Sequence, residues 1–161
     1  MSPSVTTTND FVRAILITGL IAGTMDITGA CISAYLTARL SPVFILHYIA
    51  SGVLGKESFS GGVLTAAFGL LIHYFIAYSW TVLFFLAYTK LSFLAANKII
   101  VGILYGAFVW VMMNQVILRI AGIVPANASF NVMEAATGMF ILMICIGLPI
   151  AIGANKFYRR Q

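Results

Sequence analysis

The sequence predicts an all-α membrane protein, a four-helix bundle with one additional short helix on its outer side. Two observations predict this fold. Of the 161 residues, 61% are hydrophobic and only 8% are charged, whereas a soluble domain carries about 25% charged residues. The apolar residues also form four separate runs, each long enough to supply the roughly 20 residues that cross a bilayer. We therefore expect residues 1–161 to form a single transmembrane domain with no separate soluble part.

The first span is predicted at residues 11–36. It is too long to be the apolar region of a cleaved signal peptide, which has about 7 to 15 residues, so we expect it to remain in the protein. The next apolar stretch, residues 42–54, follows Arg39 and precedes Lys56 and Glu57. A stretch of about 10 to 14 residues is too short to span. We expect it either to lie in the outer interface or to re-enter the membrane.

The other three spans follow turn-forming or polar segments. Residues 58–62 are serine and glycine around one phenylalanine, which favours a turn and a helix start. The predicted spans cover residues 61–89, 98–121 and 130–155.

The basic residues predict the orientation. With the amino terminus inside, six of them lie on the inner side and three on the outer side. The inner set is Arg13, Lys90, Lys98, Lys156, Arg159 and Arg160, and the outer set is Arg39, Lys56 and Arg119. Because Lys and Arg concentrate on the cytoplasmic side, we expect both termini in the cytoplasm and the chain in a bacterial inner membrane. The basic residues are distributed among the loops and do not form a stripe on one element. We therefore expect lipid, and not nucleic acid, as their partner.

Small residues at helical spacing form a stripe on each span. Helices in lipid use such residues to approach closely, and charged groups in a membrane face the bundle interior. Asp26 lies in the first stripe and His73 in the second. The stripes comprise Gly19, Ala22, Gly23, Gly29, Ala30 and Ser33; Gly62, Ala66, Gly69 and Ala77; Gly102 and Gly106; and Gly138, with Thr137 and Cys145 on the side of the helix that carries Glu134. They predict contact between these helices, or with a second copy or partner helices.

The polar residues within the spans predict an outward-facing polar pocket around Asp26 and His73. Counted at about 1.5 Å per residue from the outer helix ends, Asp26, His73 and Asn114 lie about 12 to 16 Å deep. His47 and Tyr48 are expected near the mouth. Asp26 has two interpretations. It hydrogen-bonds to backbone, to a neighbouring helix or to His73 as a packing contact, or it exchanges a proton or holds a cationic group and titrates as a coupled unit with His73.

Other candidate residues have two interpretations each. Glu134 and Arg119 lie nearer the outer surface, where they contribute to ligand recognition or instead form an ion pair or extend to the interface. Asn114 either contacts a ligand or hydrogen-bonds within the bundle. The aromatic residues between 74 and 88 are interpreted as lipid contacts and an inner interfacial belt.

Motifs of membrane enzymes are absent from the sequence. It contains no CxxC, GxSG or HExxH motif, so an enzyme is not favoured and no metal site is predicted. We expect no cofactor. The alternative is a b-type haem bound through His73, for which a dimer would supply the second axial histidine.

Two segments carry a resemblance to a known family. The run Gly19-Leu20-Ile21-Ala22-Gly23-Thr24-Met25-Asp26 and the later Phe59-Ser60-Gly61-Gly62 resemble uncharacterised four-helix bacterial inner-membrane proteins of the YagU-like family. That likeness implies the fold and brings no established chemistry. The chain also looks broadly like the small multidrug exporters, which are proton-coupled dimers, but it is longer and has Asp26 in place of a glutamate.

Together these observations predict the function class. We expect an integral membrane protein that binds or translocates a small solute or a proton. The alternative is a non-catalytic accessory or assembly subunit of a larger membrane complex, bound through the glycine stripes.

Overall fold

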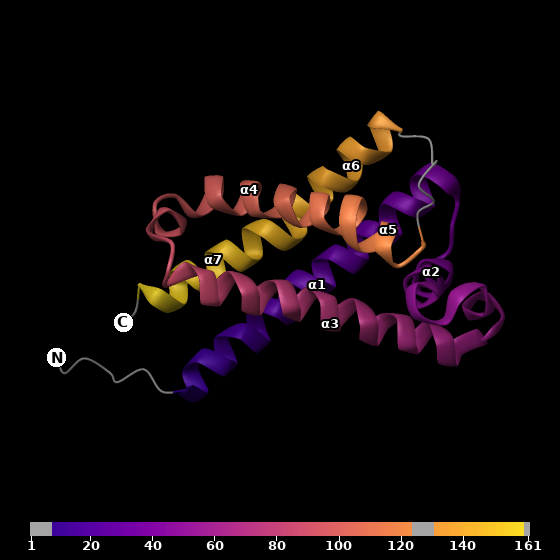
Figure 1. Cartoon of the computed structure of the whole chain (residues 1–161), viewed down its shortest axis with the longest axis horizontal. Coiled ribbons are helices and arrows are strands. Elements are labelled where there is room, and N and C mark those ends of the chain that lie inside the picture. The colour runs from indigo at the N-terminus through magenta and orange to yellow at the C-terminus, as the bar shows by residue number, and fades with distance from the viewer. Residues whose placement is uncertain (1–7, 124–130, 160–161) are drawn as a thin grey trace.

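The computed structural model describes residues 8–123 and 131–159, which form helices and no strand (Figure 1). Within these ranges, four helices are long and apolar enough to cross a membrane. They are Thr8–Ala38, Gly62–Tyr88, Lys98–Ile120 and Val132–Tyr158. The chain is therefore an all-α, multi-pass membrane protein, as the sequence predicts. Residue 130, where the last span was expected to begin, and Arg160 lie outside the described residues.

Helices α1 (Thr8–Ala38) and α2 (Pro42–Leu54) are joined by a tight turn in which Arg39 has a φ of 55°. The side chain of Ser41 accepts a hydrogen bond from the backbone N–H of Phe44 at 3.2 Å. Pro42 begins the helix, where its missing N–H removes no helical hydrogen bond. The bounds of α2 are those predicted. Figure 1 shows α2 almost end-on, so it lies across the end of the bundle away from both termini.

Helix α3 (Gly62–Tyr88) follows a 3₁₀ segment, Gly55–Ser60, and holds α2 in place. The buried His47 of α2 donates a hydrogen bond from Nε2 to the carbonyl oxygen of Gly62 at 2.8 Å. Ser58 Oγ donates to the carbonyl oxygen of His47 at 3.0 Å. In the first half of α3, Gly69 faces the backbone of Leu46 directly.

A π-helical segment interrupts each of the last two spans. The third span comprises α4 (Lys98–Val111), η3 (Met112–Ile117) and α5 (Leu118–Ile120), and the fourth comprises α6 (Val132–Leu142), η4 (Met143–Gly147) and α7 (Leu148–Tyr158). Pro149 explains η4, because proline has no N–H for the carbonyl of Cys145 and its ring displaces that group. Nothing in the sequence explains η3. The sequence had predicted uninterrupted helices.

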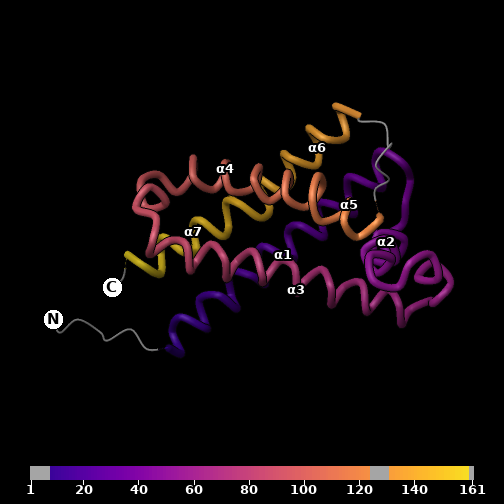
Figure 2. Tube along the Cα trace, viewed as in Figure 1, coloured from indigo at the N-terminus to yellow at the C-terminus, as the bar shows by residue number. Residues whose placement is uncertain are grey.

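Glycine residues bring the helices together within the chain. A Cβ atom on Gly102 would lie 3.0 Å from the carbonyl oxygen of Gly147, and one on Gly106 would lie 2.7 Å from the backbone nitrogen of Met143. On α1, a Cβ on Gly23 would lie 3.0 Å from the ring of Tyr74. Figure 2 traces the result: α1 and the α6–α7 span follow two similar diagonals, which cross the direction of α3 and α4. The predicted stripes thus contact other helices of the same chain.

An aromatic cluster fills the end of the bundle at which Thr8 and Tyr158 lie, called here the terminus end. Phe11, Phe85 and Phe157 meet there with ring centroids 5.6 to 6.1 Å apart, and Tyr88 stacks on Tyr158 at 4.8 Å. Phe85 is fully buried. The predicted lipid contact and interfacial belt are therefore wrong for Phe85 and Tyr88, which continue the inward face of α3 that carries His73.

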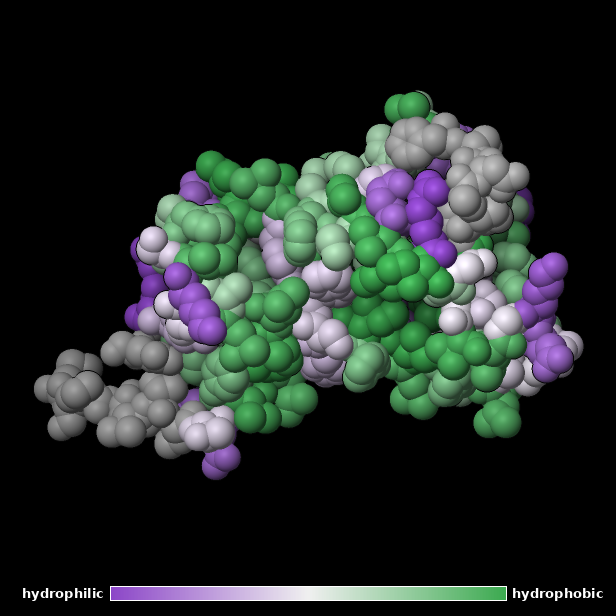
Figure 3. Space-filling view, viewed as in Figure 1, coloured by the Kyte–Doolittle hydropathy of each residue, from purple (hydrophilic) through white to green (hydrophobic). Residues whose placement is uncertain are grey.

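The outer surface of the spans is apolar. Many large side chains on them are exposed, including Phe75 at 74%. In Figure 3 the hydrophilic residues gather mostly near the two ends of the visible face and hydrophobic ones cover much of the region between. This distribution suits a helix bundle surrounded by lipid.

Candidate functional site

A large cavity of about 500 Å³ lies between α1, α2, α3 and the last two spans. Three predicted site residues line it: Asp26 from α1, His73 from α3 and Asn114 from η3. Tyr48 of α2 and Trp80 of α3 also contribute polar groups. The remaining lining residues are aliphatic, glycine, alanine or methionine. The structure thus brings Asp26 and His73 to one cavity, as predicted, but its walls are mainly apolar and not polar.

Asp26 carries an unsatisfied acceptor. Its Oδ1 atom is fully enclosed and receives no hydrogen bond from the residues that the structure describes. Leaving a buried acceptor unpaired costs about 1 to 3 kcal/mol, and such groups are rare in folded proteins. The carboxylate is therefore held in the bundle without a structural partner for this oxygen, and it can accept a hydrogen bond from a ligand.

His73 is bonded to the backbone of α1 and not to Asp26. Its Nε2 lies 2.8 Å from the carbonyl oxygen of Gly23, and since a carbonyl only accepts, Nε2 carries the hydrogen. The ring meets the edge of Tyr74 at 5.6 Å. Among the described side chains no hydrogen bond or ion pair joins Asp26 and His73, although they interact electrostatically. The sequence left open whether these two side chains touch, and the described structure shows no direct bond between them.

Asn114 lies in the π-helical segment η3. Its hydrogen bond agrees with the interpretation that this side chain bonds within the bundle. Its Nδ2 donates to the carbonyl oxygen of Trp110 at 3.0 Å, one turn earlier. Met113 and Asn114 of η3 and Ile146 of η4 all line the cavity, so both interrupted helices face it. π-helical turns occur frequently at functional sites.

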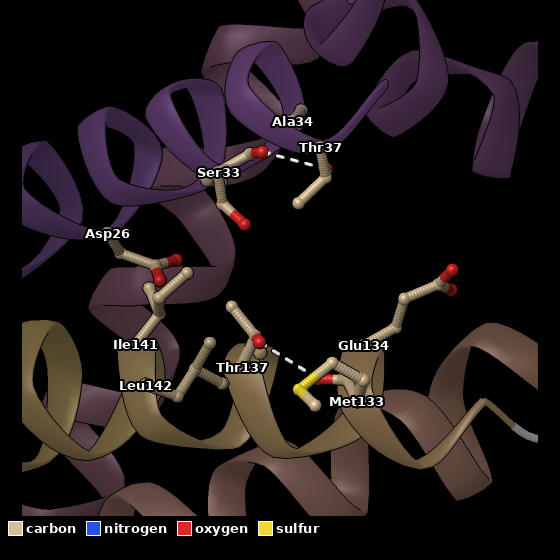
Figure 4. Close-up of a pocket in the computed structure, with 11 residues that line it drawn as sticks. Asp26, Ser33, Ala34, Thr37, Met133, Glu134, Thr137, Ile141 and Leu142 are labelled. Atoms are coloured by element: carbon tan, nitrogen blue, oxygen red, sulfur yellow. Dashed lines mark hydrogen bonds between the residues drawn. The ribbon is translucent and has the colours of Figure 1, made fainter. Parts of the chain in front are cut away.

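A second hollow, of about 310 Å³, lies between α1 and α6 and is called here the α1–α6 cleft. Asp26 also lines this cleft, together with Ser33 and Thr37 of α1 and Glu134 and Thr137 of α6. Figure 4 shows these residues on two facing helices, with Asp26 toward one end and Glu134 toward the other. Asp26 is thus a wall residue of both hollows.

Two other predicted residues, His47 and Arg119, lie outside these two linings, whereas Tyr48 lies within one. His47 bonds to Gly62 and positions α2. Arg119 is partly buried in α5, beside Leu118, which does line the cavity. Tyr48 was expected near the mouth and lies on the cavity wall. Burial raises the pKa of the Tyr48 hydroxyl above its ordinary value, so it is neutral and can donate a hydrogen bond.

The histidines bear on the cofactor hypothesis. Both rings use Nε2 to donate to a backbone carbonyl, so an iron bond through His73 Nε2 requires the hydrogen bond to Gly23 to break. In the described parts of the chain, no three His, Cys, Asp or Glu side chains are grouped so that they could hold a metal ion.

Three polar residues of the α1–α6 cleft were missing from the predicted site. Ser33 and Thr37 follow Asp26 by seven and eleven residues, and Thr137 follows Glu134 by three. Both spacings return to the same helix face. The sequence placed Ser33 on the face of Asp26 and Thr137 on the face of Glu134 as packing residues, and only the structure shows that these two faces line a common cleft.

Comparison with known proteins identified no relative. No protein-family model, curated protein or solved structure matches the chain.

Proposed function

We propose that this integral membrane protein binds a small, mainly apolar solute with one cationic or hydrogen-donating group at Asp26, and that it moves this solute or a proton across the bilayer. One observation carries the proposal: Asp26, whose enclosed Oδ1 has no hydrogen-bond partner among the described residues, lines a cavity of about 500 Å³ whose other walls are mainly apolar. Ionisable residues inside a membrane commonly mark such binding sites and pathways.

The cavity chemistry supports this class of solute. Sites for drug-sized ligands have about 300 to 1,000 Å³, apolar walls and a few placed polar groups. A cationic group would satisfy the Asp26 carboxylate, since an isolated charge in an apolar medium is strongly disfavoured. An apolar body would contact the aliphatic walls, and Tyr48 offers a further hydrogen bond.

The proposal includes an orientation. Arg13, Lys90, Lys98 and Lys156 lie at the terminus end, and the positive-inside rule assigns this end to the cytoplasm of a bacterial cell. Helix α2 then lies on the outer side, either in the interface or re-entering the membrane, and the cavity beneath it faces outward.

The glycine contacts favour binding over the accessory role. Gly23, Gly102 and Gly106 are covered by helices of the same chain, so partner helices would have to use other surfaces. The resemblance to YagU-like proteins and a haem bound through His73 stay predictions. A visible absorbance spectrum of the purified protein tests the haem, since a bound haem absorbs strongly near 400 nm.

Binding of tetraphenylphosphonium, an apolar monovalent cation, tests the solute proposal. Equilibrium dialysis against purified protein in detergent should show saturable binding that weakens at least tenfold in Asp26→Asn. Glu134→Gln is the matched control, because it also removes one carboxylate but from a residue outside the large cavity. Equal binding by Asp26→Asn and wild type would refute the role of Asp26.

The proton form of the proposal has its own measurement. Protein in liposomes that enclose a pH-sensitive dye should respond to an imposed pH gradient faster than empty liposomes do. The response should be lost in Asp26→Asn and retained in Glu57→Gln, which removes an exposed carboxylate that lines neither hollow. An unchanged rate in Asp26→Asn would contradict proton transfer at this residue.

A further inference from the structure

Two hollows of different chemistry meet at Asp26. The large cavity and the α1–α6 cleft share only Asp26, Ala30 and Leu142 among their described lining residues. The large cavity is apolar apart from a few groups, whereas the cleft carries hydroxyl groups along both of its helices and a second carboxylate. The same side chain is therefore reached from two directions through different surroundings.

The polar groups of the cleft are spaced along its length. On α1, Asp26, Ser33 and Thr37 lie on one face at intervals of seven and four residues, and Thr137 and Glu134 lie on the opposing face of α6. In Figure 4 the Ser33 side chain points into the space between the helices, and Glu134 points away from Asp26 toward the open side. These groups lead from an exposed carboxylate to an enclosed one.

Hydrogen bonds leave acceptor capacity along the cleft. Thr37 Oγ1 donates to the carbonyl oxygen of Ser33 at 2.8 Å, and Thr137 Oγ1 donates to that of Met133 at 2.8 Å. A hydroxyl that donates to the backbone still has lone pairs that accept from water. About 310 Å³ holds several water molecules, since each takes roughly 30 Å³ in the liquid.

We propose that the α1–α6 cleft is a water-filled entry through which protons reach Asp26 from the outer side, separate from the apolar cavity that holds the solute. A hydronium ion in the cleft transfers its proton to the Asp26 carboxylate, which leaves one water molecule and a neutral carboxylic acid. The titratable groups nearest Asp26 on the neighbouring helices are His73 on α3 and Cys145 in η4, and Glu134 on α6 lines the same cleft. The inference rests on the proposed function only for the role given to Asp26.

Cysteine accessibility tests whether the cleft holds water. The variants Ser33→Cys and Thr137→Cys are made in a background in which Cys31 and Cys145 are replaced by serine. The matched controls are Ile32→Cys and Phe140→Cys, whose native side chains are 55% and 64% exposed on the outer surface of α1 and α6 at similar depth. The probe is a charged methanethiosulfonate added outside intact cells, which reacts with the thiolate that forms in water.

We expect labelling of the two cleft variants to be at least tenfold faster than labelling of the two lipid-facing controls. Equally slow labelling of all four would mean that lipid or another helix fills the cleft, and equally fast labelling would mean that the cleft is no special entry. Either result overturns the proposal. An uncharged maleimide added after denaturation must label all four variants, which confirms that each thiol is intact. Size-exclusion chromatography confirms that each variant folds.

A second measurement separates the entry from the proposed function. Charged reagent attached to the Thr137→Cys variant should slow dye-reported proton uptake at least tenfold while tetraphenylphosphonium binding stays unchanged. Loss of both activities or of neither would contradict a separate proton entry. Failure of Asp26→Asn to alter either activity would refute the proposed function but leave the cysteine labelling pattern as it is.

Discussion

Replacing Gly69 with alanine should push α2 away from α3. The added methyl group would overlap the carbonyl oxygen of Leu46 and lie 2.8 Å from its carbonyl carbon. Heavy atoms in ordinary contact are about 3.5 to 4.0 Å apart, so the two helices must separate by about 1 Å. A backbone carbonyl has no alternative rotamer, and the α2 helix has to move as a unit.

The magnitude follows from two opposing effects. Overpacking of this kind costs about 1 to 3 kcal/mol, whereas Gly→Ala within a helix gains about 1 kcal/mol of helix propensity. Gly29→Ala is the matched control, because its methyl group would meet only side-chain atoms, Ile141 Cγ2 at 3.0 Å and Cys145 Sγ at 3.4 Å. These atoms can shift by a few tenths of an ångström. Gly69→Ala should therefore be less stable than Gly29→Ala by about 1 to 3 kcal/mol.

Unfolding of the purified protein in mixed micelles with increasing sodium dodecyl sulfate, followed by circular dichroism, measures this difference. The Gly69→Ala curve should shift to lower detergent fraction and the Gly29→Ala curve should not. If Gly69→Ala proves as stable as Gly29→Ala, the close approach of α2 to α3 is wrong. The position of Tyr48 at the cavity wall would then be wrong as well.

Three further substitutions are measured in the same unfolding assay. Asp26→Leu should leave stability unchanged or raise it, because it removes an unpartnered buried acceptor; a loss of about 3 to 5 kcal/mol would instead reveal a paired carboxylate. His73→Phe removes the bond to Gly23 and should cost about 1 kcal/mol, and an unchanged curve would refute that bond. Tyr105→Phe removes a 2.6 Å hydrogen bond and should cost more than Tyr78→Phe, whose bond is 3.1 Å long and exposed; the reverse order would contradict the structure.

The helical elements were largely predictable because each has a strong local signal. Four apolar runs of spanning length predict the four long helices, and Ser41 and Pro42 mark the start of α2. The π-helical turns were not predicted. Pro149 indicates the position of η4, because it cannot donate the helical hydrogen bond to the carbonyl oxygen of the residue four positions earlier. The η3 segment has no such residue, so only the packed structure shows it.

The candidate site was predictable in part. Small residues around Asp26 and His73 correctly placed both on the inward faces of their helices. The apolar walls were not predictable, because a side chain that lines an apolar cavity and one that faces lipid have the same composition in a membrane protein. The absence of a direct bond from His73 to Asp26 depends on helix rotation, which small-residue spacing does not determine.

The same ambiguity explains the misassigned aromatic residues. Phe85 and Tyr88 lie near the end of a span, where aromatic side chains commonly face the interface. They also lie on the same helical face as His73, which points inward. In the structure both side chains are buried on this inward face.

The contacts among Phe11, Phe85 and Phe157 have a kinetic consequence for any solute bound near Asp26. Each aromatic pair contributes about 0.5 to 1.5 kcal/mol beyond its burial, so separating the three pairs costs about 1.5 to 4.5 kcal/mol. A form open at the terminus end is then a minor species, between roughly a tenth and a thousandth of the molecules. Under the proposed transport function, substituting these rings by alanine would raise that population and speed the release of bound solute to that side.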